Sequence, residues 1–463
     1  MRRESDSIGM MEVPEKAYYG VQTLRAKMNF CITGKRLHPL FIRNMAKIKK
    51  AAAKTNYMAG DLDAVRMGAI CKACDEIIQG QWADEFIVDP IQGGAGTSAN
   101  MNANEVIANR ANELLGGKLG VYDRVHPNDD VNRAQSTNDV IPTAGKLTVL
   151  DLIPGVLAEL SRLEEALEDK AVEFAHILKM GRTQMQDAVP MTLGQSFHAY
   201  ASVVNRDIRR IRRVSGELYS VNMGGTAIGS AINVSPMYLS HIVGNLAELS
   251  GYPLKQAEDL FDGTQNLDGF VQVSNTLKTC AVNLSKMCND LRLLSSGPKT
   301  GFSEINLPAM QNGSSIMPGK VNPVIPEVVT QVAYHIIGHD CTITMAAEAG
   351  QLELNAFEPV LFYNLFESLD TLTGAVKTLV DHCICGITAN EKHCRELVES
   401  SVGIVTALCP YIGYKKAADI AKEALKTGTT VEKLVLEHGL MNKKEMEEVL
   451  NPQKMTGNQE FAV

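Results

Sequence analysis

The feature that most constrains this sequence is a long helical pattern over residues 268–296. The run contains no proline and, after Gly269, no glycine. Its apolar residues recur at alternating intervals of three and four: Phe270, Val273, Leu277, Cys280, Leu284, Met287, Leu291 and Leu294. This spacing predicts a helix that packs lengthwise in a bundle and, at 1.5 Å per residue, spans about 43 Å.

A second pattern of the same kind covers residues 193–218. Its apolar positions are Leu193, Phe197, Tyr200, Val204, Ile208, Ile211, Val214 and Leu218. The opposite side carries five arginines, Arg206, Arg209, Arg210, Arg212 and Arg213, which we interpret as a solvated or inter-subunit face rather than an anion site. Shorter patterns predict further helices over 152–174, 328–345 and 361–380.

These patterns predict an all-α fold in three segments. Residues 1–136 form a mainly helical N-terminal domain, residues 137–388 a central bundle of long helices, and residues 389–463 a small C-terminal helical domain. The apolar seams are too wide to be covered by one chain, so we expect the bundle to assemble into an oligomeric helical core.

Charge and hydropathy exclude several classes of partner. The net charge of -8 and the pI near 5.8 leave no basic surface for nucleic acid. The N-terminal arginines are followed by Glu4 and Asp6 rather than an apolar core, so no secretory signal is predicted. No uncharged apolar stretch is long enough to predict a membrane span, and we expect a cytoplasmic protein.

Ten cysteines are present, and two groups of them have spacings that deserve comparison with metal sites. One group is Cys71 and Cys74; the other consists of His382, Cys383, Cys385, His393 and Cys394. Neither group has the paired spacing of a zinc module. We interpret them as reduced, packed thiols and predict no metal ligand.

Four polar, glycine-containing segments adjoin the apolar helices. They are GGAGTSANMNANE (93–105), QSTNDV (135–140), GRTQMQDAVP (181–190) and GSSIMPGKVNP (313–323). None has phosphate-loop spacing. Their hydroxyl, amide and cationic side chains are typical of a site for a dicarboxylate, although helix capping explains any one of them equally well.

The segment GSSIMPGKVNP resembles the signature of the aspartase/fumarase superfamily, and the other three segments resemble its remaining active-site motifs in the same order. The resemblance extends from YYGVQTLRA (18–26) to VESSVGIVTALCPYIGY (398–414). Gln184 follows Thr183 where fumarases have histidine, and Thr137 stands where fumarases have a second serine. The chain therefore resembles the ammonia-lyases of the superfamily, which implies elimination of ammonia from L-aspartate to give fumarate.

The resemblance also implies roles for individual residues. Ser314 would be the base that removes a proton from the β-carbon, and an aci-carboxylate intermediate would follow. The substrate-binding residues would be Thr97, Ser136, Thr137 and Ser315 at the β-carboxylate, Thr183, Lys320 and Asn322 at the α-carboxylate, and Asn138 at the amino group, with Gln184 beside them. No cofactor would be required, and the sequence leaves activation by divalent cations open.

The resemblance further implies a homotetramer whose active sites are shared between subunits. Three sequence features stay undecided. The segment HPNDD, with His126, Asn128 and Asp129, is either a secondary anion site or a capped turn. Glu327 is either an ordinary glutamate in the first turn of a helix or an acid that has lost its partner, and Arg182 either orients Thr183 or pairs with an acid. The alternatives are a class II fumarase, another lyase of a succinyl compound, or a non-catalytic helical bundle.

Overall fold

The computed structural model describes residues 1–450 and Thr456. The chain divides into two compact units, of which unit 1 comprises residues 1–157, 209–281 and 334–373. Unit 2 comprises residues 158–208, 282–333 and 374–463. The prediction of an all-α fold is confirmed, because the strands among the described residues form only two-stranded pairs. The division into three domains at residues 136 and 388 stays a prediction.

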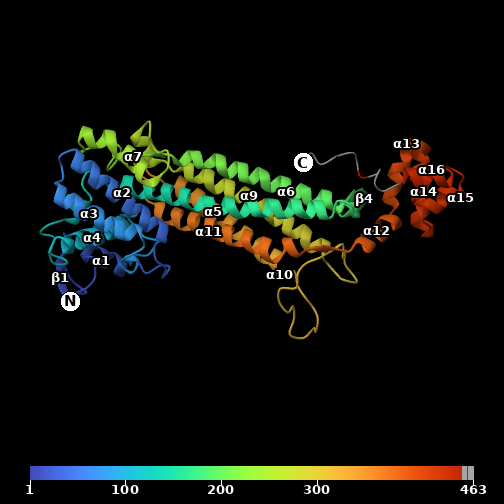
Figure 1. Cartoon of the computed structure of the whole chain (residues 1–463), viewed down its shortest axis with the longest axis horizontal. Helices are drawn as coiled ribbons and strands as arrows, with labels where there is room; N and C mark the ends of the chain where they lie inside the picture. The colour runs from blue at the N-terminus through green and yellow to red at the C-terminus, as the bar shows by residue number, and fades with distance from the viewer. Residues whose placement is uncertain (451–455, 457–463) are drawn as a thin grey trace. The chain divides into compact units, whose positions relative to one another are not determined.

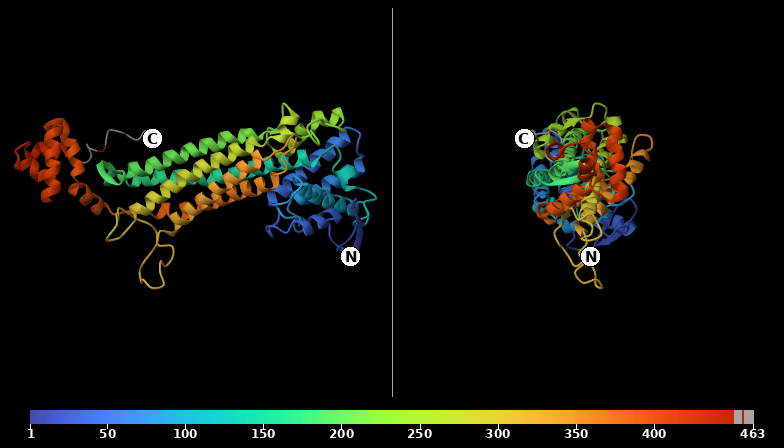
Figure 2. Two further views of the ribbon diagram at one scale, coloured as in Figure 1. Left: turned by 180° about the vertical axis from the view of Figure 1, so that it is seen from behind. Right: turned by 90° about the vertical axis from the view of Figure 1, so that its right-hand side faces the viewer.

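Five long helices pass from one unit to the other: α5 (Thr137–Glu173), α6 (Leu193–Val214), α9 (Asp268–Leu294), α10 (Val324–Glu348) and α11 (Glu358–His382). Within each unit, Figures 1 and 2 show the parts of these helices lying side by side. Every predicted seam residue of α9 is buried, from Phe270 to Leu294. The seam of α6 is also confirmed, but the helix ends at Val214, and buried Leu218 lies in the short 3-10 turn Ser215–Leu218 that follows.

The predicted start of α5 is wrong. The helix begins at Thr137 rather than at Leu152, and it runs through Pro142 and Pro154. Each proline removes one backbone hydrogen bond, which costs about 3 kcal/mol in an isolated helix. Apolar burial offsets this cost, because Val140, Ile141, Ala144 and Leu147 around the first proline are all buried.

Side-chain contacts join the long helices within each unit. In unit 1, the Asp340 carboxylate on α10 accepts from Ser274 Oγ and Lys278 Nζ on α9, both at 2.7 Å. In unit 2, the Asn283 side-chain amide on α9 donates to Asp207 on α6 at 2.9 Å. The Phe362 ring of α11 packs against the α5 backbone at Gly145, where a Cβ atom would lie 2.2 Å from the ring. The seams are therefore closely packed as well as apolar.

The rest of unit 1 consists of shorter elements. They are β1 (Arg2–Ser5), β2 (Met10–Val13), α1 (Val21–Asn29), α2 (Pro39–Met58), α3 (Ala64–Ile78), α4 (Thr97–Leu114), β5 (Ser220–Val221), α7 (Pro236–Ser250), β6 (Lys255–Gln256) and α8 (Leu260–Gln265). β1 pairs with β2 in antiparallel fashion, and β5 pairs with β6 in parallel.

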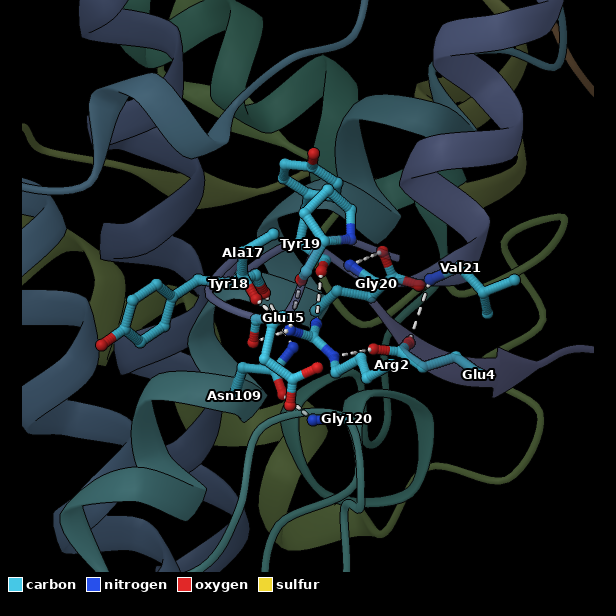
Figure 3. A network of polar contacts seen from close by, with 12 residues as sticks. Arg2, Glu4, Glu15, Ala17, Tyr18, Tyr19, Gly20, Val21, Asn109 and Gly120 are labelled. Atoms are coloured by element: carbon cyan, nitrogen blue, oxygen red, sulfur yellow. Dashed lines mark hydrogen bonds and ion pairs between the residues drawn. The ribbon is translucent and has the colours of Figure 1, made fainter. Parts of the chain in front are cut away.

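The N-terminal strands are held by the side chain of Arg2, whose contacts are drawn in Figure 3. Its guanidinium donates to Glu4 Oε1 at 2.7 Å and to the carbonyls of Ala17 at 2.7 Å and Tyr19 at 2.9 Å. The carboxylate of Glu4 in turn accepts from Val21 N at the start of α1. Arg2, near the N-terminus, is therefore an ordered part of the folded structure.

The rest of unit 2 consists of strand pairs and short helices. They are β3 (Leu178–Thr183), β4 (Gln186–Thr192), β7 (Ile305–Asn306), β8 (Thr388–Ala389), α12 (Glu391–Ser400), α13 (Cys409–Ile412), α14 (Tyr414–Thr427), α15 (Val431–Glu437) and α16 (Lys443–Val449). The C-terminal helices share an apolar core with Met180 of β3, so the hairpin β3–β4 has a packed support.

Among the described residues, α5 is the one helix long and apolar enough to pass a test for membrane spans. Its most apolar window is 67% buried inside the protein. A core helix of a water-soluble bundle has the same length and composition, so this helix is weak evidence for a membrane.

Candidate active site

Unit 1 brings together four of the predicted site residues at the starts of two helices. Thr97 is the first residue of α4, and Ser136, Thr137 and Asn138 lie at the start of α5. Asn100, one turn into α4, donates from Nδ2 to Thr137 Oγ1 at 3.3 Å, which links the two helix starts. Helix N-termini carry partial positive charge, so this pair of ends favours an anionic ligand.

The turn before α4 permits this approach only with glycine. Gly96 has φ of +87°, a left-handed conformation that side chains rarely adopt. A Cβ atom there would also lie 3.0 Å from the side chain of Ile141 on α5. Gly96 of GGAG therefore permits the close packing of the two helix starts.

The hydroxyl groups at these helix starts differ in their hydrogen bonds. Thr137 Oγ1 accepts from Asn100, and Ser136 Oγ accepts from Asn138 N at 3.2 Å, so both keep a proton to donate. Thr97 Oγ1 instead donates to Gly94 O at 2.7 Å and must rotate before it donates to a ligand. Asn138 Nδ2 donates to Ala227 O at 2.7 Å, which orients the amide while its oxygen can still accept a hydrogen bond.

A buried lysine lies beneath Thr137. Lys49 Nζ on α2 donates to Asn100 Oδ1 at 2.7 Å and to Asn132 Oδ1 at 2.8 Å. Burial lowers the pKa of Lys49 to about 7, against the attraction of Asp139. The contacts form a polarised series from Lys49 through the Asn100 amide to the Thr137 oxygen. This series makes Thr137 a stronger donor.

Asp139 holds the start of α5 in place. Its carboxylate accepts from Ser136 N at 2.9 Å, from Gly224 N at 3.2 Å and from Thr226 N at 3.1 Å. Burial raises the pKa of Asp139 to about 6, and the hydrogen bonds and Lys49 oppose the rise. This one side chain ties GGTAIGS (224–230) to QSTNDV.

In unit 2, Thr183 and Gln184 lie at the tip of the hairpin β3–β4. Gln184 and Met185 have φ of 52° and 65°, the conformation of a tight hairpin turn that normally takes glycine or asparagine. Such strain costs of order 1–3 kcal/mol per residue and is a reason to suspect a functional turn.

Strand β3 of this hairpin is held by ion pairs. Arg182 Nη1 lies 2.5 Å from Glu304 Oε1, and Lys179 Nζ lies 3.2 Å from Glu304 Oε2. Glu304 is fully buried between these two cations. Of the two alternatives for Arg182, the structure shows pairing with an acid. This ion pair also supports the strand that leads to Thr183.

The loop Gly313–Pro323 is closed on itself in unit 2. Gly313 N donates to Lys320 O at 2.8 Å, and Asn322 Nδ2 donates to Gly313 O at 2.9 Å. Figure 1 shows a long loop between α9 and α10, which includes the short strand β7. Lys320 is exposed and makes no ion pair with any residue that the structure describes. Its charge is therefore available to a ligand.

Ser314 and Ser315 differ in their surroundings. Ser314 Oγ accepts from two backbone N–H groups, those of Ile316 and Met317, each at 3.2 Å. Ser315 is exposed. Two N–H donors directed at one hydroxyl oxygen stabilise negative charge on that oxygen. The same contacts give Ser314 a capping role in the turn, so capping and catalysis are compatible here.

The predicted site residues therefore fall into three groups. Thr97, Ser136, Thr137 and Asn138 lie together in unit 1, Thr183 and Gln184 lie at the hairpin tip, and Ser314, Ser315, Lys320 and Asn322 lie in the loop. No hydrogen bond or ion pair joins the hairpin tip to the loop within the described part of the chain. Their assignment to one site stays a prediction.

Two undecided residues have structural partners. His126 caps the turn Pro127–Val131, because its Nδ1 accepts from Asn128 N at 3.3 Å and Asp129 N at 3.2 Å. Glu327, in the first turn of α10, lies 3.7 Å from Arg292 of α9. The contacts therefore agree with a capped turn at His126 and with an ordinary first-turn glutamate at Glu327.

Several residues that matter here are not predicted from the sequence. Asn100, Asn132 and Asp139 are ordinary polar residues in their segments, and only Lys49 has a local signal, a lysine within the apolar pattern of α2.

Among residues 1–450 and Thr456, the one cluster of potential metal ligands is His335, His339 and Glu367, and neither cysteine group forms one. Burial raises the pKa of the Cys74 thiol well above its ordinary value, in keeping with a packed thiol.

The sequence also matches models of known protein families. A family model described as Lyase matches residues 9–338, and one described as Fumarase C C-terminus matches residues 404–457. The chain belongs to the aspartase/fumarase superfamily of lyases.

Its relatives include several named aspartate ammonia-lyase. One from a Bacillus species is 52% identical and covers 98% of this chain and 97% of the relative. Another, from Escherichia coli K12, is 48% identical with coverage of 98% and 96%.

Two solved structures show the same fold. The cobalt-bound crystal structure of fumarate lyase:delta crystallin from Brucella melitensis superposes with a TM-score of 0.96 at 50% identity, covering 98% of this chain and 99% of that one. Recombinant class II fumarase from Schistosoma mansoni superposes with a TM-score of 0.95 at 36% identity and the same coverage.

The role of Asp139 leads to a prediction. Asp139→Asn leaves one carboxylate position as an NH₂ group that faces N–H donors, so we expect a loss of stability of roughly 1–3 kcal/mol. Urea unfolding at fixed protein concentration measures this loss. The exposed Asp123→Asn serves as the control and should leave the unfolding midpoint unchanged. An unaltered midpoint in Asp139→Asn would contradict the assigned role.

Proposed function

We propose that this chain is an aspartate ammonia-lyase, which reversibly eliminates ammonia from L-aspartate to give fumarate. The observation that carries the proposal is Ser314, whose Oγ accepts two backbone N–H bonds within a loop that also holds Lys320. Relatives of this name, about half identical over nearly the whole chain, support the same function.

The first step is removal of a proton from the β-carbon of aspartate. A serine hydroxyl is a weak base, so it acts as an alkoxide, whose charge the N–H groups of Ile316 and Met317 stabilise. The electron pair of the broken C–H bond moves into the β-carboxylate and forms an aci-carboxylate dianion. The C–N bond then breaks on the opposite face, the double bond forms, and ammonia leaves.

Stabilisation of the dianion is the main energetic requirement. We assign this role to Thr97, Ser136 and Thr137 at the helix starts of unit 1, together with Ser315. Preorganised donors of this kind contribute several kcal/mol to a transition state with developing negative charge. The buried Lys49 acts through Asn100 and Thr137 as a positioning residue.

The α-carboxylate and amino group fix the orientation of the substrate. We assign the α-carboxylate to Thr183, Lys320 and Asn322, and the amino group to Asn138. Gln184 stands at the strained tip of the β3–β4 hairpin, where an imidazole would assist the handling of water. An amide does not transfer protons near neutral pH. This difference favours ammonia over water as the leaving group.

The substrate preference is directly testable. We expect fumarate to form from L-aspartate at least roughly a hundredfold faster, in kcat/KM, than from L-malate, because a site built to bind an amine leaves its polar groups unpaired with a hydroxyl. The absorbance of fumarate measures both rates. Equal or faster turnover of malate would overturn the assignment in favour of a fumarase.

The role of Ser314 gives a second test of the function. Ser314→Ala should lower kcat for aspartate by roughly 10²–10⁴-fold, the contribution typical of a positioned base. Ser400→Ala, which alters an exposed serine of α12, is the matched control and should retain activity. Near-normal turnover in a folded Ser314→Ala protein would mean that another group removes the proton.

We also propose a cytoplasmic homotetramer without an organic cofactor. Exposed apolar side chains on the long helices support assembly: Val282 on α9 is 50% exposed, and Tyr334 and Met345 on α10 are 62% and 66% exposed. Exposed apolar side chains along a helix are typical of a face that another subunit covers. The resemblance to the superfamily supports active sites made from three chains.

Shared sites predict complementation between inactive variants. Ser314→Ala and Thr137→Val change different segments of the proposed site, so mixed tetramers should regain activity at up to about a quarter of their sites by random assortment. The two proteins are unfolded and refolded together, and activity is measured in tetramers that contain both. Each variant refolded alone is the control. Absence of recovery in verified mixed tetramers would show that each chain builds its own site.

A further inference from the structure

A group of metal-ligating side chains lies on α10 and α11 of unit 1. His335 and His339 are four residues apart on α10, and therefore project from one face of the helix. Glu367 reaches them from α11. One ligand atom from each of the three residues lies within 4.8 Å of the others. None of the three has a role in the proposed elimination.

We infer that His335, His339 and Glu367 form a binding site for a divalent transition metal ion such as Zn²⁺ or Co²⁺, which joins α10 to α11. Two imidazoles and one carboxylate are a ligand set that suits these ions, whereas Mg²⁺ and Ca²⁺ prefer oxygen ligands. Three protein ligands leave one position for water.

The side chain of His339 is oriented for this task. Ser368 Oγ donates its proton to Asn364 O at 2.8 Å. The oxygen of Ser368, 2.9 Å from His339 Nδ1, therefore accepts a hydrogen bond from the N–H group of that nitrogen. With Nδ1 protonated, the Nε2 atom of the neutral ring keeps its lone pair for a metal. An oriented histidine held through its other nitrogen is the usual support of a metal ligand.

The remaining distances need only small side-chain movements. His335 Nε2 lies 4.0 Å from Glu367 Oε1, and the two imidazole centroids are 3.9 Å apart. Ligand atoms around a tetrahedral zinc ion are about 3.3 Å apart. His335 is 49% exposed at its side chain and Glu367 28%, so both have room to move, whereas buried His339 provides the fixed point.

Lys35 is the charged group that opposes the metal. Its Nζ lies 3.3 Å from Glu367 Oε1 and 5.1 Å from the centre of the Tyr363 ring. Its side chain is 55% exposed, so it can turn into solvent when a cation binds Glu367. Metal binding thus replaces one positive charge at Glu367 by another. Removal of Lys35 should strengthen metal binding.

The experiment uses the full-length protein after dialysis against a chelator. Co²⁺ is titrated while its visible absorption is recorded, and Zn²⁺ is then added as a competitor. We expect one Co²⁺ per chain, displaced by Zn²⁺, without the near-ultraviolet charge-transfer band that thiolate ligands produce. Binding should also raise the unfolding temperature, because the ion binds only the folded arrangement.

Variants identify the ligands. His335→Ala, at an exposed position, should weaken Co²⁺ binding by at least about tenfold, as should His339→Gln, and Ser368→Ala should weaken it roughly tenfold through loss of the support for His339. Lys35→Met should strengthen binding. His438→Ala is the matched control, since it removes an exposed histidine 2.9 Å from a carboxylate, that of Glu423, without a second histidine beside it.

Three outcomes would overturn the inference. They are failure of the wild-type protein to bind Co²⁺, a thiolate charge-transfer band showing that exposed cysteines such as Cys341 hold the ion, and unchanged binding in His335→Ala. Circular dichroism establishes that each variant is folded. Aspartate turnover is measured in parallel, because His335→Ala should leave it intact and thereby separate this site from the proposed function.

Discussion

The packing of long apolar seams is the constraint on which the rest of the structure depends. The buried seam of α9 extends over the whole helix, and its neighbours match it with seams of their own. Long helices tolerate a local loss of hydrogen bonds. In α5, the burial of apolar side chains offsets the two backbone hydrogen bonds that the prolines remove. The packed helices in turn hold the polar segments at their ends in fixed positions.

The polar groups of unit 1 show what that rigidity makes possible. Lys49 and Asp139 are wholly buried, and each has a pKa shifted toward its neutral form. Burying such groups is unfavourable unless they are hydrogen-bonded, and here they hold Asn100, Ser136 and the start of α5. These hydrogen bonds fix the position of the hydroxyl groups that we propose bind an anion.

Ser314, the proposed base, lies in a different kind of environment. The loop Gly313–Pro323 is closed by contacts among its own residues, and its apolar side chains, such as Ile316 at 83% exposure, point into solvent. Within such a loop, the local turn directs two N–H groups at Ser314, and this arrangement needs no other segment. In the proposed reaction, the helix starts would bind the carboxylate anion and the loop would supply the base.

The sequence by itself determined the helical seams and the family, because each of these is a local pattern with a regular period or a long specific motif, and the same motif predicts the segment of the base. It did not determine where α5 begins, the partners of Lys49, or the grouping of His335, His339 and Glu367, because those depend on burial and on contacts between residues far apart in the chain. Only the tertiary structure sets these, since hydrogen bonds and packing act through space and leave no periodic trace in the sequence.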